Sequence, residues 1–115
     1  MARYTSSYLV NLPLEQLPQA INKILQSCGF ESVYHATDYM MAREIPGEVV
    51  FSKLVTVEIL IDSTKAKIGE IPITWVIKND ELPLQVTNHC QQRFGQIQEI
   101  ISQHQQWNLI ASAAN

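Results

Sequence analysis

The side chains that could bind a metal ion or attack a substrate are few in this sequence and lie far apart. They are two cysteines and three histidines: Cys28, Cys90, His35, His89 and His104. A structural zinc site takes about four ligands, usually in close sequence pairs. The only adjacent candidates, His89 and Cys90, would point about 100° apart on a helix. The spacing therefore predicts no metal site.

Motifs for nucleophilic catalysis and phosphate binding are also missing. Cys28 and Cys90 both fall in apolar stripes, where a thiol acts as a small hydrophobic group rather than as a nucleophile. The sequence contains no Gly-x-Ser-x-Gly segment, and its four glycines are isolated, so it has neither a P-loop nor a dinucleotide-binding motif. We therefore expect no catalytic residue and no cofactor, and the sequence favours a protein that is not an enzyme.

One arginine stands among residue types that often line ligand sites. Arg43 alternates with Met41 and Tyr39 in a segment with strand character, so these three side chains share a face. An arginine beside aromatic and thioether groups can anchor an anionic ligand. With two further aromatic residues, the candidate ligand-binding set is Tyr8, Tyr39, Arg43 and Trp75. The competing interpretation is that the aromatic residues are ordinary strand residues and that the arginine pairs with a glutamate or faces solvent.

Two segments with apolar residues at every third or fourth position predict amphipathic helices. The first covers residues 13–28, and Gly29 behind it suits a left-handed cap. The second runs from about residue 84 to about residue 107, and its polar side is rich in glutamine. That neutral side lacks the basic residues that nucleic acids and membrane surfaces require. It is therefore either a solvated surface or a protein-docking face.

Alternating polar and apolar residues predict short strands before and between these helices. The expected strands cover residues 3–11, two segments within 30–45 with a turn at 36–38, and then 49–61, 65–71 and 73–78. Strands joined by short turns pair antiparallel. The order β-α-β-β-β-β-β-α thus predicts a two-layer α+β domain, with an antiparallel sheet of about five strands and both helices on one face.

Two helices can cover only one side of such a sheet, so the other side should stay open. With strict alternation, that side carries mostly polar residues and a few apolar ones: Ser6, Tyr8, Ser52, Leu54, Thr56, Glu58 and Leu60. A partly apolar open face is often covered by a partner. The simplest partner is a second copy of the chain, because most soluble oligomers are symmetric homo-oligomers.

Length and composition set limits on the whole molecule. The chain has 115 residues, is 46% apolar and carries a formal net charge of −3. This length fits one domain, 1–115, with a tail that we expect to fray from about residue 108. The mild acidity argues against a nucleic-acid binder, and without an apolar run of about 18 residues we expect no membrane-spanning helix. The sequence shows no signal-peptide pattern and no paired cysteine motif, so the cytoplasm is the expected compartment.

Two functions remain open on these grounds. The first is a small cytoplasmic, non-catalytic binding or adaptor protein that acts by association, as a homodimer or with another protein. The second is a small-ligand carrier or enzyme, whose pocket lies between the sheet and the C-terminal helix, is lined by the candidate set and takes a small anionic ligand. We expect no nucleic-acid partner and no membrane partner.

Overall fold

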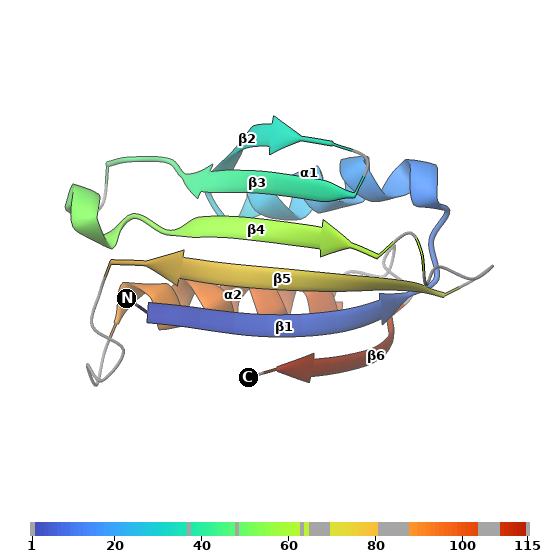
Figure 1. Cartoon of the computed structure of the whole chain (residues 1–115). Helices are drawn as coiled ribbons and strands as arrows, with labels where there is room; N and C mark the ends of the chain where they lie inside the picture. Colours follow the sequence, from blue (N-terminus) through green and yellow to red (C-terminus); the bar gives the residue numbers. More distant parts are fainter. Residues whose placement is uncertain are drawn as a thin grey trace.

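Six strands form one antiparallel sheet in the order β2-β3-β4-β5-β1-β6 (Figure 1). The computed structural model describes residues 2–36, 38–47, 49–62, 64, 70–80, 88–103 and 109–114. The strands are β1 (Ala2–Val10), β2 (Phe30–His35), β3 (Tyr39–Glu44), β4 (Thr56–Ile61), β5 (Ile71–Asn79) and β6 (Leu109–Ala114). The helices are α1 (Leu17–Ser27) and α2 (His89–Gln103), with short 3-10 turns η1 (Leu14–Gln16) and η2 (Phe51–Lys53).

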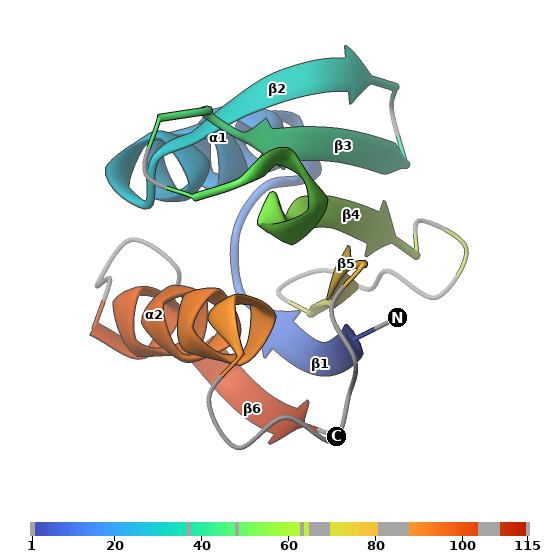
Figure 2. The ribbon, with the colours of Figure 1, turned by 90° about the vertical axis from the view of Figure 1, so that its left-hand side faces the viewer.

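Both helices lie on the same side of the sheet, as Figure 2 shows. In the described part of the chain, no helix covers the opposite side. The predicted α+β class and its one-sided arrangement are therefore confirmed. The predicted C-terminal helix corresponds to α2, and the flanking residues 84–87 and 104–107 lie outside the described residues.

The hydrophobic core fills the layer between the sheet and the helices. Burying these apolar side chains is the main force that holds the two layers together. The fully buried large side chains are Leu17, Ile21, Ile24 and Leu25 of α1, Phe30, Ile59, Ile73, Trp75 and Ile77 of the sheet, and Ile97 and Ile101 of α2.

The limits of α1 follow from its terminal residues. Pro18 stands in the first turn, where a backbone N–H would have no partner within the helix. Gly29 follows the helix with a φ of 81°, a left-handed conformation that glycine adopts without a steric penalty. Its N–H donates to the carbonyl of Gln26, which satisfies one of the terminal carbonyl groups. The predicted glycine cap is confirmed.

The C-terminal segment differs from the expected frayed tail. Residues Leu109–Ala114 form β6, which pairs antiparallel with β1 and extends the sheet by one strand. Small residues dominate this segment, so no polar and apolar alternation marks it as a strand. Backbone hydrogen bonds to an otherwise unpaired edge of β1 explain why it is extended here.

The strand predicted at 49–61 is shorter in the structure. Only Thr56–Ile61 belongs to β4, and the residues before it form η2, where the N–H of Leu54 donates to the carbonyl of Phe51. The apolar residues Val49 and Val50 favour a strand locally. Within the described residues, no neighbouring strand extends far enough to pair with them, because β3 ends at Glu44 and β5 ends at Asn79.

Of the two strands predicted at 65–71 and 73–78, the described residues show β5, which contains the whole of the second. It begins at Ile71, and most of the predicted strand 65–71 lies outside the described residues. Pro72 is part of β5 and accepts a hydrogen bond from the N–H of Asp62. Because proline has no N–H, it cannot return that bond, and the β4–β5 pairing stops at Ile61 and Ile73.

The face assigned to Ser6 and Tyr8 is wrong. Both side chains are buried on the helix side of β1, in the same line as Val10. The opposite line of β1, with Arg3 and Ser7, faces outward. Alternation alone shows that two faces exist, but only packing against the helices decides which one is buried. None of the helices in the described ranges is long and apolar enough to cross a membrane.

Candidate functional site

The uncovered side of the sheet is formed by every second residue of its strands, and we call it the open face. Thr56, Glu58 and Leu60 lie on it, as predicted, because they alternate with the buried residues of β4. The side chain of Ser52 lies outside what the structure describes, and Leu54 precedes β4. The other strands add Glu31 and Tyr34, Tyr39, Met41 and Arg43, Thr74, Val76 and Lys78, and Arg3, Thr5 and Ser7.

Strand register gathers the described cations of the open face into one line. Arg43 pairs with Thr56, Thr56 pairs with Lys78, and Lys78 pairs with Arg3. Arg43, Lys78 and Arg3, which we call the basic row, therefore extend over three strand spacings of about 4.8 Å each. They lie at the end of the sheet where the chain begins, which is on the left in Figure 1. Because they are far apart in the sequence, no basic motif predicts this row.

Next to the basic row, large apolar side chains form the apolar centre of the open face: Tyr34, Tyr39, Met41 and Leu60. Met41 pairs with Tyr34 across β2 and β3, and Tyr39 pairs with Leu60 across β3 and β4. The tyrosine rings have centroids 5.8 Å apart and are tilted against each other. Tyr34 is 55% exposed and Leu60 is 44% exposed. This patch leaves apolar surface in water that a partner could bury.

One acidic side chain connects the apolar centre to the basic row. Glu58 forms an ion pair with Lys78, and the hydrogen bond from Lys78 holds the pKa of the Glu58 carboxyl below its ordinary value. Burial raises the pKa of Tyr39, and the neighbouring Glu58 carboxylate raises it further. Both acid–base groups therefore keep their usual forms at neutral pH.

The four residues predicted to bind a ligand do not surround one pocket. Tyr39 and Arg43 lie on the open face, whereas Tyr8 and Trp75 point into the core under the helices. Burial raises the pKa of the Tyr8 hydroxyl. The sheet separates the two pairs, because alternate residues of a strand point to opposite sides. A ligand on the open face would meet only Tyr39 and Arg43.

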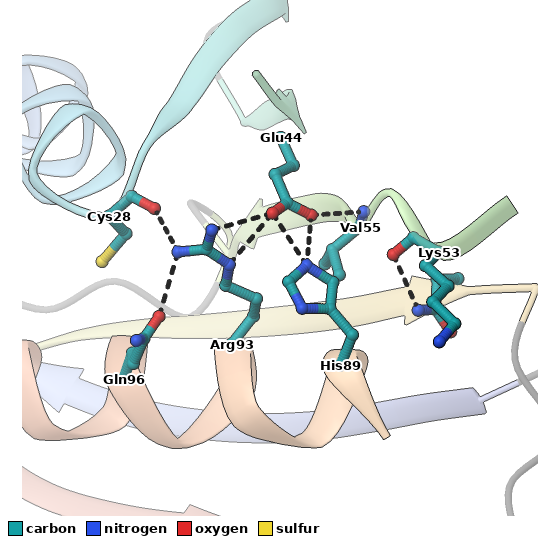
Figure 3. A network of polar contacts seen from close by, with 8 residues as sticks. Cys28, Glu44, Lys53, Val55, His89, Arg93 and Gln96 are labelled. Carbon is teal, nitrogen blue, oxygen red and sulfur yellow. Dashed lines mark hydrogen bonds and ion pairs between the residues drawn. The ribbon is translucent and has the colours of Figure 1, made fainter. Parts of the chain in front are cut away.

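A buried polar network, which the sequence did not predict, ties α2 to the rest of the molecule (Figure 3). The carboxylate of Glu44 is 1% exposed and lies 2.8 Å from both Nε2 of His89 and one guanidinium nitrogen of Arg93. It also accepts a hydrogen bond from the N–H of Val55 at 3.1 Å. We call the three side chains Glu44, His89 and Arg93 the clamp.

The clamp has the features of a structural element rather than of a catalytic site. Arg93 also donates to the carbonyl of Cys28, at the end of α1, and to Gln96, each at about 3 Å. The thiol of Cys28 points away from the network in Figure 3, and burial raises its pKa. A helical spacing of four puts His89 and Arg93 on one side of α2. This spacing can be read from the sequence. The sequence does not show that both residues contact Glu44, which is 45 residues away from His89.

The groove between the helices offers no evident ligand chemistry. An open hollow of about 500 Å³ lies between the end of α1 and α2. Its charged residues are Arg93, which is held by Glu44, and Glu99. Over the described ranges, no three histidine, cysteine, aspartate or glutamate side chains are grouped so that they could hold a metal ion.

Comparison with known proteins assigns no family to this arrangement. A scan against protein-family models gave no match, and a search of curated proteins gave none either.

Proposed function

We propose that this protein is a small, non-catalytic binding protein that acts by association through its open face, and that the partner on this face is a second copy of the chain. The observation that carries the proposal is the apolar centre, with Tyr34 and Leu60 about half exposed on a face without a helix. Apolar patches surrounded by polar residues mark interaction sites on soluble proteins. The reducing cytoplasm is the compartment that we propose, since Cys28 and Cys90 are free thiols.

The dimensions of the molecule support an interface of ordinary size. The chain measures 42 × 24 × 24 Å along its principal axes, so one long side offers on the order of 1,000 Å². A stable protein interface buries about 800 Å² on each partner. The open face is therefore large enough for a dimer, provided that most of it is covered.

Face-to-face packing is favoured over pairing through the edge of the sheet. At one edge, the pairing of β2 with β3 shifts register between Ser32 and Tyr34. Bulges and charged residues at an edge hinder the addition of another strand. Packing through the open face needs no added strand, because two packed sheets bury their inner side chains in a shared core.

The test is the molar mass in solution of the wild type and of Leu60→Asp, measured by light scattering during size-exclusion chromatography. We expect the wild type to have twice the chain mass of 13.1 kDa and the variant to have the mass of a single chain. A carboxylate in the middle of a buried interface would lose its hydration without gaining a partner. Tyr34→Ser serves as a second variant in case Leu60→Asp does not fold.

Phe51→Ser is the matched control. Phe51 is 83% exposed, but it lies on η2 rather than on the open face. This variant should remain dimeric. A monomeric wild type at high micromolar concentration would overturn the proposal, as would a dimer that Phe51→Ser breaks and Leu60→Asp leaves intact.

A further inference from the structure

Two hydroxyl groups on the helix side of β1 are buried without a hydrogen-bond partner. Ser6 is 1% exposed and Tyr8 is 6% exposed, and both side chains point into the layer between the sheet and the helices. No group in the described part of the chain forms a hydrogen bond with the oxygen atom of either hydroxyl. Buried polar groups in folded proteins are almost always bonded to the protein or to ordered water. This pair therefore needs a partner that the described residues do not supply.

The strand pairing explains why the neighbouring backbone does not serve these hydroxyls. At Ser6 and Tyr8, β1 pairs with β5 on one side and with β6 on the other. The N–H and C=O groups of β1 are therefore used in the two ladders. On the helix side, Tyr8 belongs to the hydrophobic core, whose other members are apolar side chains and offer a hydroxyl little to bond with.

The two hydroxyls lie near each other but are not bonded to each other. Ser6 and Tyr8 are two residues apart on one strand, so their side chains leave the sheet on the same side. Burial raises the pKa of Tyr8, and the Ser6 side chain is near enough to lower it in smaller part. The pair nevertheless lies outside hydrogen-bond geometry. This arrangement fits a small molecule that accepts a hydrogen bond from one hydroxyl and donates one to the other.

We infer that one water molecule is bound inside the protein, where it bridges the hydroxyls of Ser6 and Tyr8. Water both donates and accepts hydrogen bonds, and each hydroxyl offers one donor and two acceptor positions, so a single water serves both groups. Buried waters are regular components of globular proteins and bond to polar groups that the protein leaves unsatisfied. The water site lies on the opposite side of the sheet from the open face and is independent of the proposed function.

A high-resolution crystal structure of the wild type tests the site directly. We expect electron density for one water oxygen within about 3 Å of both hydroxyl oxygens. The same density should be missing from the crystal structure of Ser6→Ala/Tyr8→Phe. A wild-type structure in which another group of the protein bonds to these hydroxyls would overturn the inference, as would one with no density between them.

Deletion of each hydroxyl tests the same site in solution. Tyr8→Phe and Ser6→Ala each remove one partner of the water, so each should lower the midpoint of thermal unfolding by about 4 °C. The double variant should lose less than the sum of the two single losses, because both substitutions act on the same water. Ser7→Ala is the matched control, since Ser7 is the next residue of β1 and faces outward. Its midpoint should stay within about 2 °C of the wild type.

The sign of these effects separates a bound water from two hydroxyls that are buried without any partner. In the second case, each substitution removes an uncompensated polar group, so the midpoint of each single variant rises. Such a rise, or no change in either variant, would overturn the water site. Losses that simply add in the double variant would also overturn it, because they would show that the hydroxyls have separate partners. All variants are compared at one protein concentration, so that self-association does not affect the comparison.

Discussion

In the clamp, two side chains compensate the buried charge of a third. The carboxylate of Glu44 is removed from water, and the guanidinium of Arg93, the imidazole of His89 and the N–H of Val55 replace its hydration. A buried ion pair is weak evidence for net stability, since desolvation offsets most of the attraction. Removing one member is different, because the remaining charge stays buried without compensation.

Glu44→Gln should therefore destabilise the protein strongly. We expect the free energy of unfolding to fall by about 3 kcal/mol, because the guanidinium of Arg93, whose side chain is only 15% exposed, loses its counter-charge. Urea unfolding followed by circular dichroism measures this loss. A loss below about 1 kcal/mol, the range of exposed pairs, would show that the clamp does not hold α2 in place.

Glu58→Gln is the matched control, since it removes a carboxylate from an ion pair at the surface. Its cost should stay within about 1 kcal/mol at neutral pH. The folded-state pKa of Glu58 is lowered by Lys78, so the stability that this carboxylate contributes is present above its ordinary pKa of 4.5 and is lost as the pH falls below it. The difference between the wild type and this variant should accordingly shrink in acid.

At the scale of elements, α1 shows where the chain must turn. The helix is followed by Gly29, which has a positive φ, and the chain then enters β2. The carbonyl of Cys28, just before this glycine, accepts a hydrogen bond from Arg93 of the clamp. Two glycines of the chain, Gly29 after α1 and Gly95 within α2, differ in backbone conformation but not in surrounding space. A Cβ atom at either position would meet no other atom within 4 Å.

Alanine substitutions at these two glycines should have opposite effects. Gly29→Ala should lower the free energy of unfolding by about 1–2 kcal/mol, because φ is 81° there and a Cβ atom disfavours this conformation. Gly95→Ala should raise it by up to about 1 kcal/mol, since alanine is the better helix former. Thermal unfolding of both variants measures the difference. A neutral or stabilising effect of Gly29→Ala would contradict the conclusion that the positive φ at this position requires glycine.

For the whole molecule, the main consequence of the fold is its asymmetry. Two helices shield one side of the six-stranded sheet, and the other side is in contact with water or with a partner. The unusual exposure of Leu60 and Tyr34 is a property of this arrangement rather than of either residue. Anything that associates with the native protein alone stabilises it by mass action.

The unfolding midpoint should therefore depend on protein concentration. If folding and association through the open face are coupled, the wild-type midpoint rises with concentration, because dilution favours separate chains. The Leu60→Asp midpoint should stay constant over the same range. Differential scanning calorimetry at several concentrations measures both. A wild-type midpoint that does not change with concentration would contradict the dimer. This result would be independent of the molar mass measured by light scattering.

Local patterns were sufficient to predict much of the fold. The helix at 13–28 and its glycine cap follow from apolar spacing and from the conformational freedom of glycine, both of which act within a few residues. The same local signals misplaced the start of β4 and missed β6. A strand forms where a neighbouring backbone can pair with it, and the sequence around Val49 or Leu109 carries no information about that neighbour.

The candidate site was predicted only in part. The shared face of Tyr39 and Arg43 follows from alternation along one strand. That Arg43, Lys78 and Arg3 form one row follows instead from the register of three strand pairs, which joins residues up to 75 positions apart. For the same reason, the sequence could not show that Tyr8 and Trp75 lie on the other side of the sheet.

The sequence by itself determined the types of most elements, the α+β class and the absence of common catalytic motifs, because periodicity and turn chemistry depend on residues that are close along the chain. Only the tertiary structure decided which sheet face is covered, how the charges are aligned and which carboxylate holds α2. These properties depend on contacts between distant segments, and the free energy of those contacts is set by burial and pairing in the folded molecule.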